Sequence, residues 1–156
     1  MKLVKDYMKT KIRKVKPRDS IFKVAEIFSK YHISGAPVVR GKKVVGVITG
    51  SDIIRFMKLD LSKTHSEFAV EPHTISILVL ALVKDQLGIK ERLENLSKIL
   101  AKDLMTREVI AIGPDESILE AATKLDEHKI ERLPVVENGK LIGIISRSDL
   151  IRALLD

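Results

Sequence analysis

Hydrophobic and polar positions follow the same order of patterns twice along this chain. Residues 21–28 place apolar side chains at helical spacing, and residues 37–48 form two apolar runs on either side of Gly41-Lys42, as a β-hairpin does. Aligning Val4 with Ala101, 97 positions later, repeats both patterns without a gap. About a third of the aligned residues are identical, so the chain is an internal repeat of two like units.

Each copy predicts a short leading helix followed by β-α-β-β-α. In the first copy we expect a helix over 2–9, an extended segment over 11–15, a helix from Asp19-Ser20 to Tyr31-His32, the hairpin, and a helix capped by Ser51-Asp52 that runs to Met57. In the second we expect a helix ending at 103–106, an extended segment over 109–112, a helix from Glu116-Ser117 to about His128, a hairpin around Asn138-Gly139, and a helix capped by Ser148-Asp149.

The segment between the copies has no counterpart in either of them. Residues 58–72 read as a loop, residues 74–87 as an apolar helix ended by Gly88, and residues 89–104 as an amphipathic helix. We expect this helical hairpin to cover the protein's own core or a dimer partner, with a functional groove as the alternative. The predicted organisation is one unit over 1–57, an insert over 58–100 and a second unit over 101–156.

Composition narrows the functional class. The chain has 156 residues, of which 45% are hydrophobic, and it has no cysteine, so disulfides and thiolate chemistry are excluded. It shows no leader pattern and no apolar run long enough to span a membrane, and we expect a cytoplasmic protein. No order of residues typical of a catalytic triad or a phosphate-hydrolysing loop is present, and no histidine spacing fits a metal site, so we expect neither an enzyme nor a metal protein.

Positive charge is concentrated in the first third of the chain. Of the net charge of +7, residues 1–60 contribute 15 Lys and Arg against 5 Asp and Glu, whereas the rest of the chain has 13 against 16. A basic cluster attracts phosphate groups, whether on nucleic acid or on a small nucleotide. A solvated basic face is the alternative interpretation.

The end of each hairpin carries the residues best suited to hold a ligand. A strand leads into Thr49-Gly50-Ser51-Asp52 in the first copy and into Ser146-Arg147-Ser148-Asp149 in the second. Hydroxyl groups and free N–H groups at a helix N-terminus donate to phosphate oxygens, and an aspartate accepts hydrogen bonds from a ribose diol. The alternative is that these residues only cap helices, but the occurrence of the same turn in both copies favours a ligand site.

The ordered set of motifs resembles a tandem pair of CBS domains, also called a Bateman module. The resemblance rests on the Asp-x-Met motifs at Asp6 and Asp103, on residues 32–39 and 129–136 with their shared Pro-Val-Val, and on the two turns ending in Ser-Asp. It covers about 1–57 and 100–156. It implies an α+β fold in which two pseudo-symmetric units pack sheet to sheet, often as a homodimer. It also implies two clefts that bind adenosine compounds between the units.

The resemblance assigns residues to both clefts. The main cleft would contain Arg13, Ile33, Ser34, Gly35, Ala36 and Pro37 from one unit and Arg132, Ser146, Ser148 and Asp149 from the other. The second cleft would contain Ile110, Ile130, Glu131, Leu133 and Pro134 opposite Thr49, Ser51 and Asp52. The resemblance also places Arg132 in this second base pocket.

The two clefts differ in charge. Arg132 corresponds to Gly35, and Arg147 corresponds to Gly50. Because a guanidinium matches phosphate and stays charged, the Asp149 cleft should be the better nucleotide site. The implied function is a sensor of AMP, ADP, ATP or S-adenosylmethionine, with Mg²⁺ if the ligand is ATP, that passes a conformational change to an unknown partner protein. The alternatives are a nucleic-acid-binding protein that uses the basic third and a scaffold with empty clefts.

Overall fold

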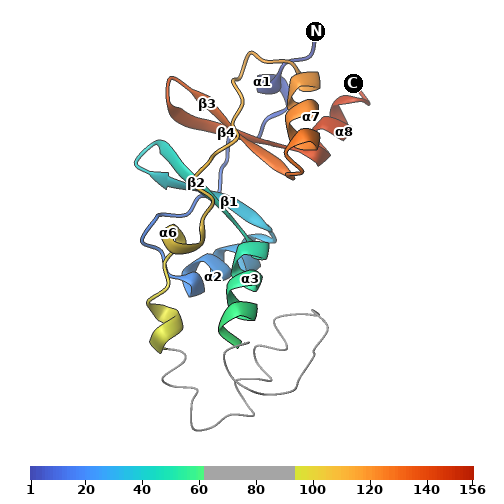
Figure 1. Cartoon of the computed structure of the whole chain (residues 1–156). Coiled ribbons are helices and arrows are strands. Elements are labelled where there is room, and N and C mark those ends of the chain that lie inside the picture. The colour runs from blue at the N-terminus through green and yellow to red at the C-terminus, as the bar shows by residue number, and fades with distance from the viewer. Residues whose placement is uncertain (62–93) are drawn as a thin grey trace.

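Two α+β units with the same order of elements make up the protein (Figure 1). The computed structural model describes residues 1–61 and 94–156. The first copy contains α1 (Val4–Tyr7), α2 (Ile21–Tyr31), β1 (Gly35–Arg40), β2 (Lys43–Thr49) and α3 (Gly50–Leu61). The second contains α6 (Ala101–Leu104), α7 (Ile118–Glu127), β3 (Arg132–Glu137), β4 (Lys140–Ser146) and α8 (Arg147–Ala153).

The predicted hairpins are confirmed, with matching irregularities. β1 pairs with β2 and β3 pairs with β4, both antiparallel, and each ladder slips by one residue at the same place, after Val38 and after Val135. The glycines of the turns, Gly41 and Gly139, have positive φ values of 63° and 75°, which glycine adopts without steric cost. The expected first strand of each copy is reduced to a single parallel bridge, Val15 to Val38 and Ile112 to Val135.

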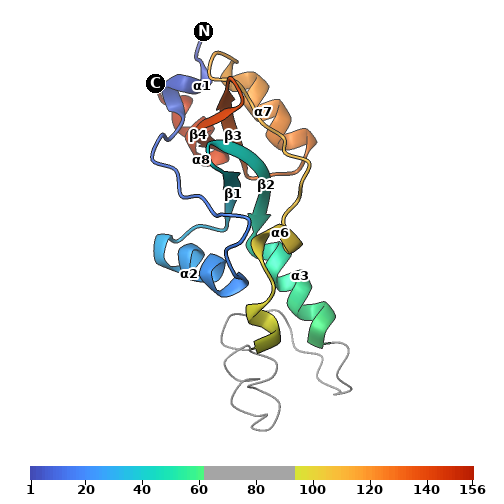
Figure 2. The same ribbon diagram turned by 90° about the vertical axis from the view of Figure 1, so that its left-hand side faces the viewer.

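Each unit takes its first helix from the other copy. The core around β3 and β4 contains Val4 of α1, whereas the core around β1 and β2 contains Ala101 of α6. The backbone continues the exchange, since Lys9 pairs with Ile144 and Thr106 pairs with Val47. The two units are therefore intertwined, as Figure 2 shows for the N-terminal segment that passes α8 and β4 before it reaches α2.

The remaining core residues occupy equivalent positions in the two units. Val15, Val24, Phe28, Ala36, Val38 and Ile48 in the first correspond to Ile112, Ala121, Leu125, Leu133, Val135 and Ile145 in the second. Burial of these apolar side chains is the main term that stabilises each unit. Packing of hairpin against hairpin joins the units, with the Leu141 N–H donating to the Lys42 carbonyl at 2.9 Å.

Three predicted boundaries need correction. The helix expected to stop at Met57 continues to Leu61. The helix expected over 89–104 is interrupted, because Leu100 is extended and bridges to Ser20 before α6 begins at Ala101. Its described part before the break covers 94–97, and the helix expected over 74–87 lies outside the described residues.

The third correction concerns the caps of α3 and α8. The residues that precede these helices are Thr49 and Ser146, not Ser51 and Ser148. Asp52 and Asp149 therefore occupy the third helical position, where a carboxylate reaches back to the N–H of the capping residue. The two aspartates accept the N–H of the residue three positions earlier, whereas Ser51 and Ser148 beside them are exposed.

Candidate functional site between the two hairpin ends

The two aspartates of the predicted clefts are fixed by the turns that contain them. Asp52 Oδ2 accepts the N–H of Thr49 at 2.8 Å and its hydroxyl at 3.0 Å. Asp149 Oδ2 accepts the N–H of Ser146 at 2.9 Å and its hydroxyl at 2.5 Å. The turns hold Oδ2 of both carboxylates in the same way, so the two sites differ in what surrounds Oδ1.

That second oxygen is surrounded by more positive charge at Asp149. Lys9 Nζ lies 3.3 Å from Asp149 Oδ1 and Arg152 Nη2 lies 3.4 Å from it, although the aspartate side chain is only 2% exposed. Among the described residues, Asp52 Oδ1 pairs with Arg55, at 3.6 Å. Lys9 makes the difference, because threonine occupies its equivalent position in the second copy. Sequence reasoning placed Lys9 in the basic cluster but did not assign it to the site.

Arg132 joins the two units at the centre of the predicted main cleft. Its Nη1 donates to the Gly35 carbonyl at 3.0 Å and its Nη2 donates to Ser34 Oγ at 2.9 Å. Gly35 and Arg132 are equivalent positions of the repeat, so this contact lies where the units meet about their pseudo-twofold axis. Arg132 also pairs with Ser146 in the β3–β4 ladder. The structure therefore brings Ser34, Gly35, Arg132, Ser146 and Asp149 into one region.

Four of the assigned residues are buried in the cores. Ala36 and Leu133 are fully buried, and Pro37 and Pro134 are buried beside them. The carbonyls of the two prolines already accept N–H bonds from Val15 and Ile112. These residues shape the strands behind the clefts, and their side chains are not placed to contact a ligand.

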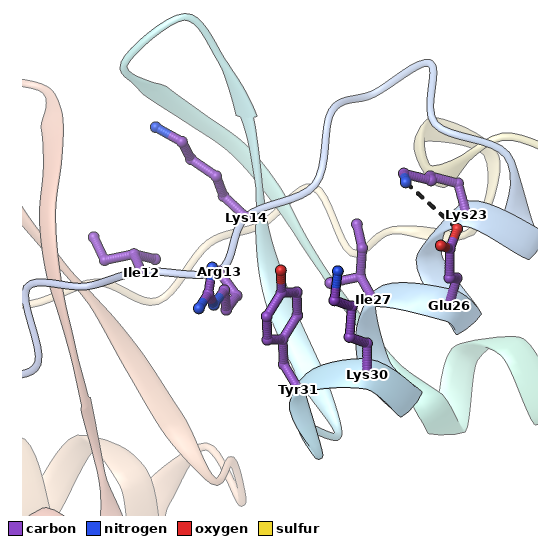
Figure 3. Close-up of a pocket in the computed structure, with 8 residues that line it drawn as sticks. All are labelled: Ile12, Arg13, Lys14, Lys23, Glu26, Ile27, Lys30 and Tyr31. Carbon is purple, nitrogen blue, oxygen red and sulfur yellow. Dashed lines mark hydrogen bonds and ion pairs between the residues drawn. The ribbon is translucent and has the colours of Figure 1, made fainter.

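Arg13 lines a groove beside α2 of the first unit. Its guanidinium stacks on the Tyr31 ring at 3.8 Å from the centroid. The groove has a volume of about 320 Å³ and runs between residues 12–14 and α2 (Figure 3). Of its lining residues, Arg13, Lys14, Lys23 and Lys30 are cationic, and the acidic residue, Glu26, is paired with Lys23 at 3.4 Å. Tyr31 was not predicted as a site residue, and its place at the end of a helix gave no indication of this contact.

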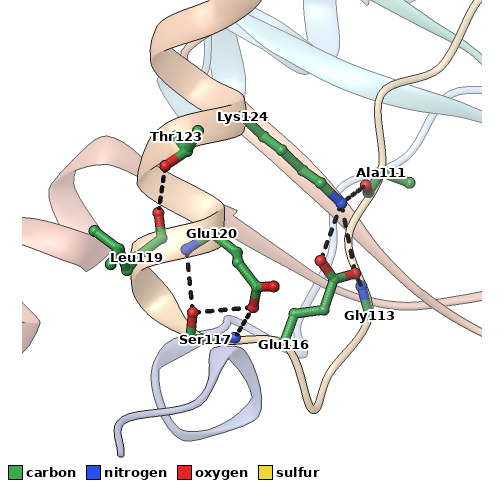
Figure 4. Close-up of polar contacts among 8 residues, drawn as sticks. All are labelled: Ala111, Gly113, Glu116, Ser117, Leu119, Glu120, Thr123 and Lys124. Carbon is green, nitrogen blue, oxygen red and sulfur yellow. Dashed lines mark hydrogen bonds and ion pairs between the residues drawn. The ribbon is translucent and has the colours of Figure 1, made fainter.

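The second unit has an ion pair at the position equivalent to Ile27. Lys124 replaces Ile27 there, and its Nζ donates to the Ala111 carbonyl at 3.1 Å and pairs with Glu116 Oε2 at 3.1 Å (Figure 4). Glu116 in turn accepts the Gly113 N–H at 2.8 Å. Ile110, which precedes this cluster, packs on the core of the second unit, as does Ile130.

The second cleft is also braced by Arg147. Its Nε donates to the Ile130 carbonyl at 3.2 Å and its Nη2 donates to the Leu125 carbonyl at 3.2 Å, while Glu131 lies 3.6 Å away. The guanidinium is thus used within the second unit. Gly50, at the equivalent position, keeps only the backbone bond, from its N–H to the Ser34 carbonyl at 2.9 Å. The residues predicted for the second cleft are therefore held by other contacts than those predicted for the main cleft.

No helix in the described parts of the chain is both long and apolar enough to cross a bilayer.

Comparison with known proteins agrees with this architecture. A family model of the CBS domain matches residues 4–59 and again residues 101–156. An uncharacterized protein of Methanocaldococcus jannaschii, MJ1426, is 41% identical over 160 residues, which cover 98% of this chain and 91% of that protein. Inosine-5'-monophosphate dehydrogenase of Korarchaeum cryptofilum is 31% identical over 137 residues, which cover 87% of this chain but only 21% of the enzyme.

Solved structures show the same fold. The CBS-pair protein CBSX2 from Arabidopsis thaliana is 26% identical, with a TM-score of 0.74 and coverage of 99% of this chain and 94% of that chain. A structure of CBSX2 in complex with AMP is 25% identical, with a TM-score of 0.71 and coverage of 99% and 97%.

Proposed function

Since the chain belongs to the CBS domain family and contains two copies of the domain, we propose that it is a regulatory module that binds an adenosine-containing ligand between its units. The ligand class is AMP, ADP, ATP or an S-adenosyl compound, and the protein acts by binding, not by catalysis. The observation that carries the proposal is the contact of Arg132 with Ser34 and Gly35, beside the Ser146–Asp149 turn. The AMP complex of the similar protein CBSX2 supports the choice of ligand.

The cleft around Asp149 is the proposed nucleotide site. Arg132 and Lys9 supply positive charge there, and the hydroxyls of Ser146 and Ser148, which lie 2.9 Å apart, supply donors. A phosphate would bind the guanidinium of Arg132 and replace the bonds that Arg132 makes to Ser34 and Gly35 of the first unit. A ribose diol would bind the outer oxygen of Asp149 in competition with Lys9 and Arg152. The cleft around Asp52 lacks an arginine equivalent to Arg132 and suits a less charged adenosyl group.

Ligand binding would act as a switch because the site includes both units. A ligand that replaces the bonds between Arg132 and the first unit changes the relative stability of the arrangements of the two hairpins. It shifts this equilibrium only by the difference between its affinities for those arrangements. A partner protein would read the shift. We also propose that the working form is a homodimer, because both helix pairs expose apolar side chains, Phe22 and Ile54 in the first unit and Leu119 and Ile151 in the second.

Isothermal titration with AMP, ATP and S-adenosylmethionine tests the proposal. We expect saturable micromolar binding to the wild type, a loss of at least tenfold in affinity for AMP or ATP in Asp149→Ala, and a smaller loss in Asp52→Ala. Asp52→Ala is the matched control, since it removes the same bonds to the turn of the other unit. Because Asp149 also caps α8, Arg132→Gln is measured beside it, and circular dichroism shows whether each variant is folded. Binding that depends on Asp52 and not on Asp149 or Arg132 would reverse the assignment of the clefts.

Nucleic-acid binding is the second candidate, favoured by the groove beside α2. Lys14, Lys23 and Lys30 are exposed there beside Arg13. Four phosphate contacts predict that log K falls with log salt concentration at a slope of about −3 to −4. A fluorescence titration of labelled single-stranded and duplex probes at several salt concentrations measures this slope. Tight, salt-dependent binding to generic probes, with no response to adenosine compounds, would favour this candidate.

A further inference from the structure

The groove beside α2 contains more positive charge than its own residues neutralise. Four cations, Arg13, Lys14, Lys23 and Lys30, and one acid, Glu26, line it, which gives a net charge of +3. Glu26 lies 3.4 Å from Lys23. Within residues 1–61 and 94–156, no ion pair involves the other three cations. These three side chains are therefore available to an anion that enters the groove.

The Arg13 guanidinium is held in place without the use of its hydrogen-bond donors. It stacks on the Tyr31 ring at 3.8 Å from the centroid, a contact that engages the face of the guanidinium. The five N–H groups lie in the guanidinium plane and form a fork that matches two oxygens of a phosphate. Four other arginines donate side-chain hydrogen bonds within the described residues, but Arg13 does not. The stacking therefore fixes a phosphate-binding group whose donors are unused by these residues.

The second copy shows that this charge does not come with the fold. The residues equivalent to the four cations are Ile110, Ala111, Glu120 and Glu127. The cation at the corresponding place, Lys124, is already paired with Glu116 at 3.1 Å. The same helix and extended segment are thus built without a cationic groove, so the groove depends on side chains that only the first copy has.

From these observations we infer that the groove beside α2 binds a small condensed phosphate, an anion with two or three linked phosphoryl groups, at a site separate from the Asp149 cleft. Arg13 would bind two oxygens of one phosphoryl group. Lys14, from the extended segment, and Lys30, from α2, would bind the next groups from the two walls of the groove (Figure 3). The volume of about 320 Å³ lies at the lower end of the range for small-molecule pockets.

The groove favours a phosphate without a base over a nucleic-acid strand. Single-stranded nucleic acids bind by stacking their bases on aromatic side chains as well as by phosphate contacts. Tyr31 is the aromatic residue in the lining, and Arg13 already covers its ring, with Lys30 Nζ at 5.5 Å from the same centroid. A base would have to displace Arg13 from the ring, whereas a condensed phosphate uses Arg13 where it stands.

Isothermal titration with sodium tripolyphosphate tests the inference. The Arg132→Gln protein is used beside the wild type, because it lacks the guanidinium of the proposed nucleotide cleft. We expect saturable binding to both proteins at low salt, weakened as the salt concentration rises. Lys14→Gln and Lys30→Gln, each added to Arg132→Gln, should raise the dissociation constant about 2- to 5-fold. Lys140→Gln is the matched control, since it removes one exposed lysine from the hairpin of the second unit and should leave the constant unchanged.

The other outcomes separate this site from the cleft and from nucleic acid. Absence of saturable binding to the Arg132→Gln protein would overturn the inference, and if the wild type still bound, the cleft would be the phosphate site. An equal loss in Lys140→Gln would overturn it as well, because the attraction would then come from net charge alone. Tight binding of a short oligothymidylate, without binding of tripolyphosphate, would favour a nucleic-acid strand in the groove instead. None of these results alters the titration of the wild type with AMP, so the proposed function stands or fails separately.

Discussion

Replacing Gly46 with alanine tests the exchange of leading segments between the units. Gly46 lies in β2, and the side chain of Met105, which follows the α6 helix of the other copy, covers it. A Cβ added at this position would lie 2.5 Å from Met105 Sδ, 2.9 Å from Met105 Cγ and 3.0 Å from the Thr106 carbonyl oxygen. Gly143 has the same relation to Met8, with Sδ at 2.5 Å. The exchange of leading segments therefore requires a residue without a side chain at position 46 of β2 and at position 143 of β4.

The expected cost follows from these distances. Forcing an extra methyl group into a packed contact costs about 1–3 kcal/mol. Alanine also restricts the unfolded chain, which returns about 0.4–1 kcal/mol. The net loss of unfolding free energy should be about 1–2 kcal/mol, or a fall in Tm of roughly 2–4 °C per kcal/mol for a chain of this size. In a Met105→Ala background the two closest atoms are gone, so the same substitution should cost less than about 1 kcal/mol.

Urea unfolding at 25 °C of the four proteins in this cycle measures the coupling. Gly50→Ala is the matched control, because a Cβ there would find only the Ser34 carbonyl, at 3.9 Å, and should leave stability unchanged or slightly raised. The reasoning is refuted if Gly46→Ala costs as much with Met105 absent as with it present. A cost equal to that of Gly50→Ala would refute it as well.

Two further predictions concern groups that hold the second unit. Ser117→Ala should cost about 1 kcal/mol at pH 7, because Ser117 caps α7 and its N–H and hydroxyl bond Glu120. These bonds lower the pKa of Glu120 below its usual 4.5. Their contribution to folding stability is therefore complete above pH 4.5 and is lost as the pH falls through the pKa of Glu120 in the folded protein. The difference in thermal stability between Ser117→Ala and the wild type should narrow in acid. Arg147→Ala should cost about 1–2 kcal/mol in urea unfolding, because it removes the side-chain donor to the Ile130 carbonyl and leaves the Leu125 carbonyl with the Ile130 N–H alone. An unchanged midpoint would contradict this.

Local structure could be predicted because both copies contain the same local patterns. The cap at Ser20, the turns at Gly41 and Gly139 and the apolar faces of the helices each depend on residues within a few positions of one another. The prediction that Ser51 caps α3 was wrong, because the helix begins at Gly50 and Thr49 precedes it. The turn instead places Thr49 at the cap, and the Thr49 hydroxyl donates to the carboxylate of Asp52, three positions later in the first helical turn.

Contacts between the copies were beyond the sequence pattern. The repeat predicted two like units but did not indicate that their leading helices are exchanged. The sequences of α1 and α6 have the same pattern, Val-Lys-Asp-Tyr and Ala-Lys-Asp-Leu, so either unit could hold either helix. The contact of Lys9 with Asp149 depends on that crossing, because Lys9 reaches the second unit only when its segment lies along β4. The groove beside α2 has no matching set of residues in the second copy, since Arg13, Ile27 and Tyr31 correspond to Ile110, Lys124 and His128.

The exchange of leading segments gives the proposed switch a physical route. The segment that contains Lys9 bonds to Ile144 in β4, continues through Arg13 beside the groove and ends in the core of the first unit at Val15. A ligand that displaces Lys9 from Asp149 acts on a strand that both units hold, and a ligand that displaces Arg132 releases the contact between the hairpin ends. The proposed ligand site and the arrangement of the units would then be coupled through this segment, which is bonded to both units. The helix faces proposed for the dimer belong to the same two units, so a change in their arrangement would reach the second copy as well.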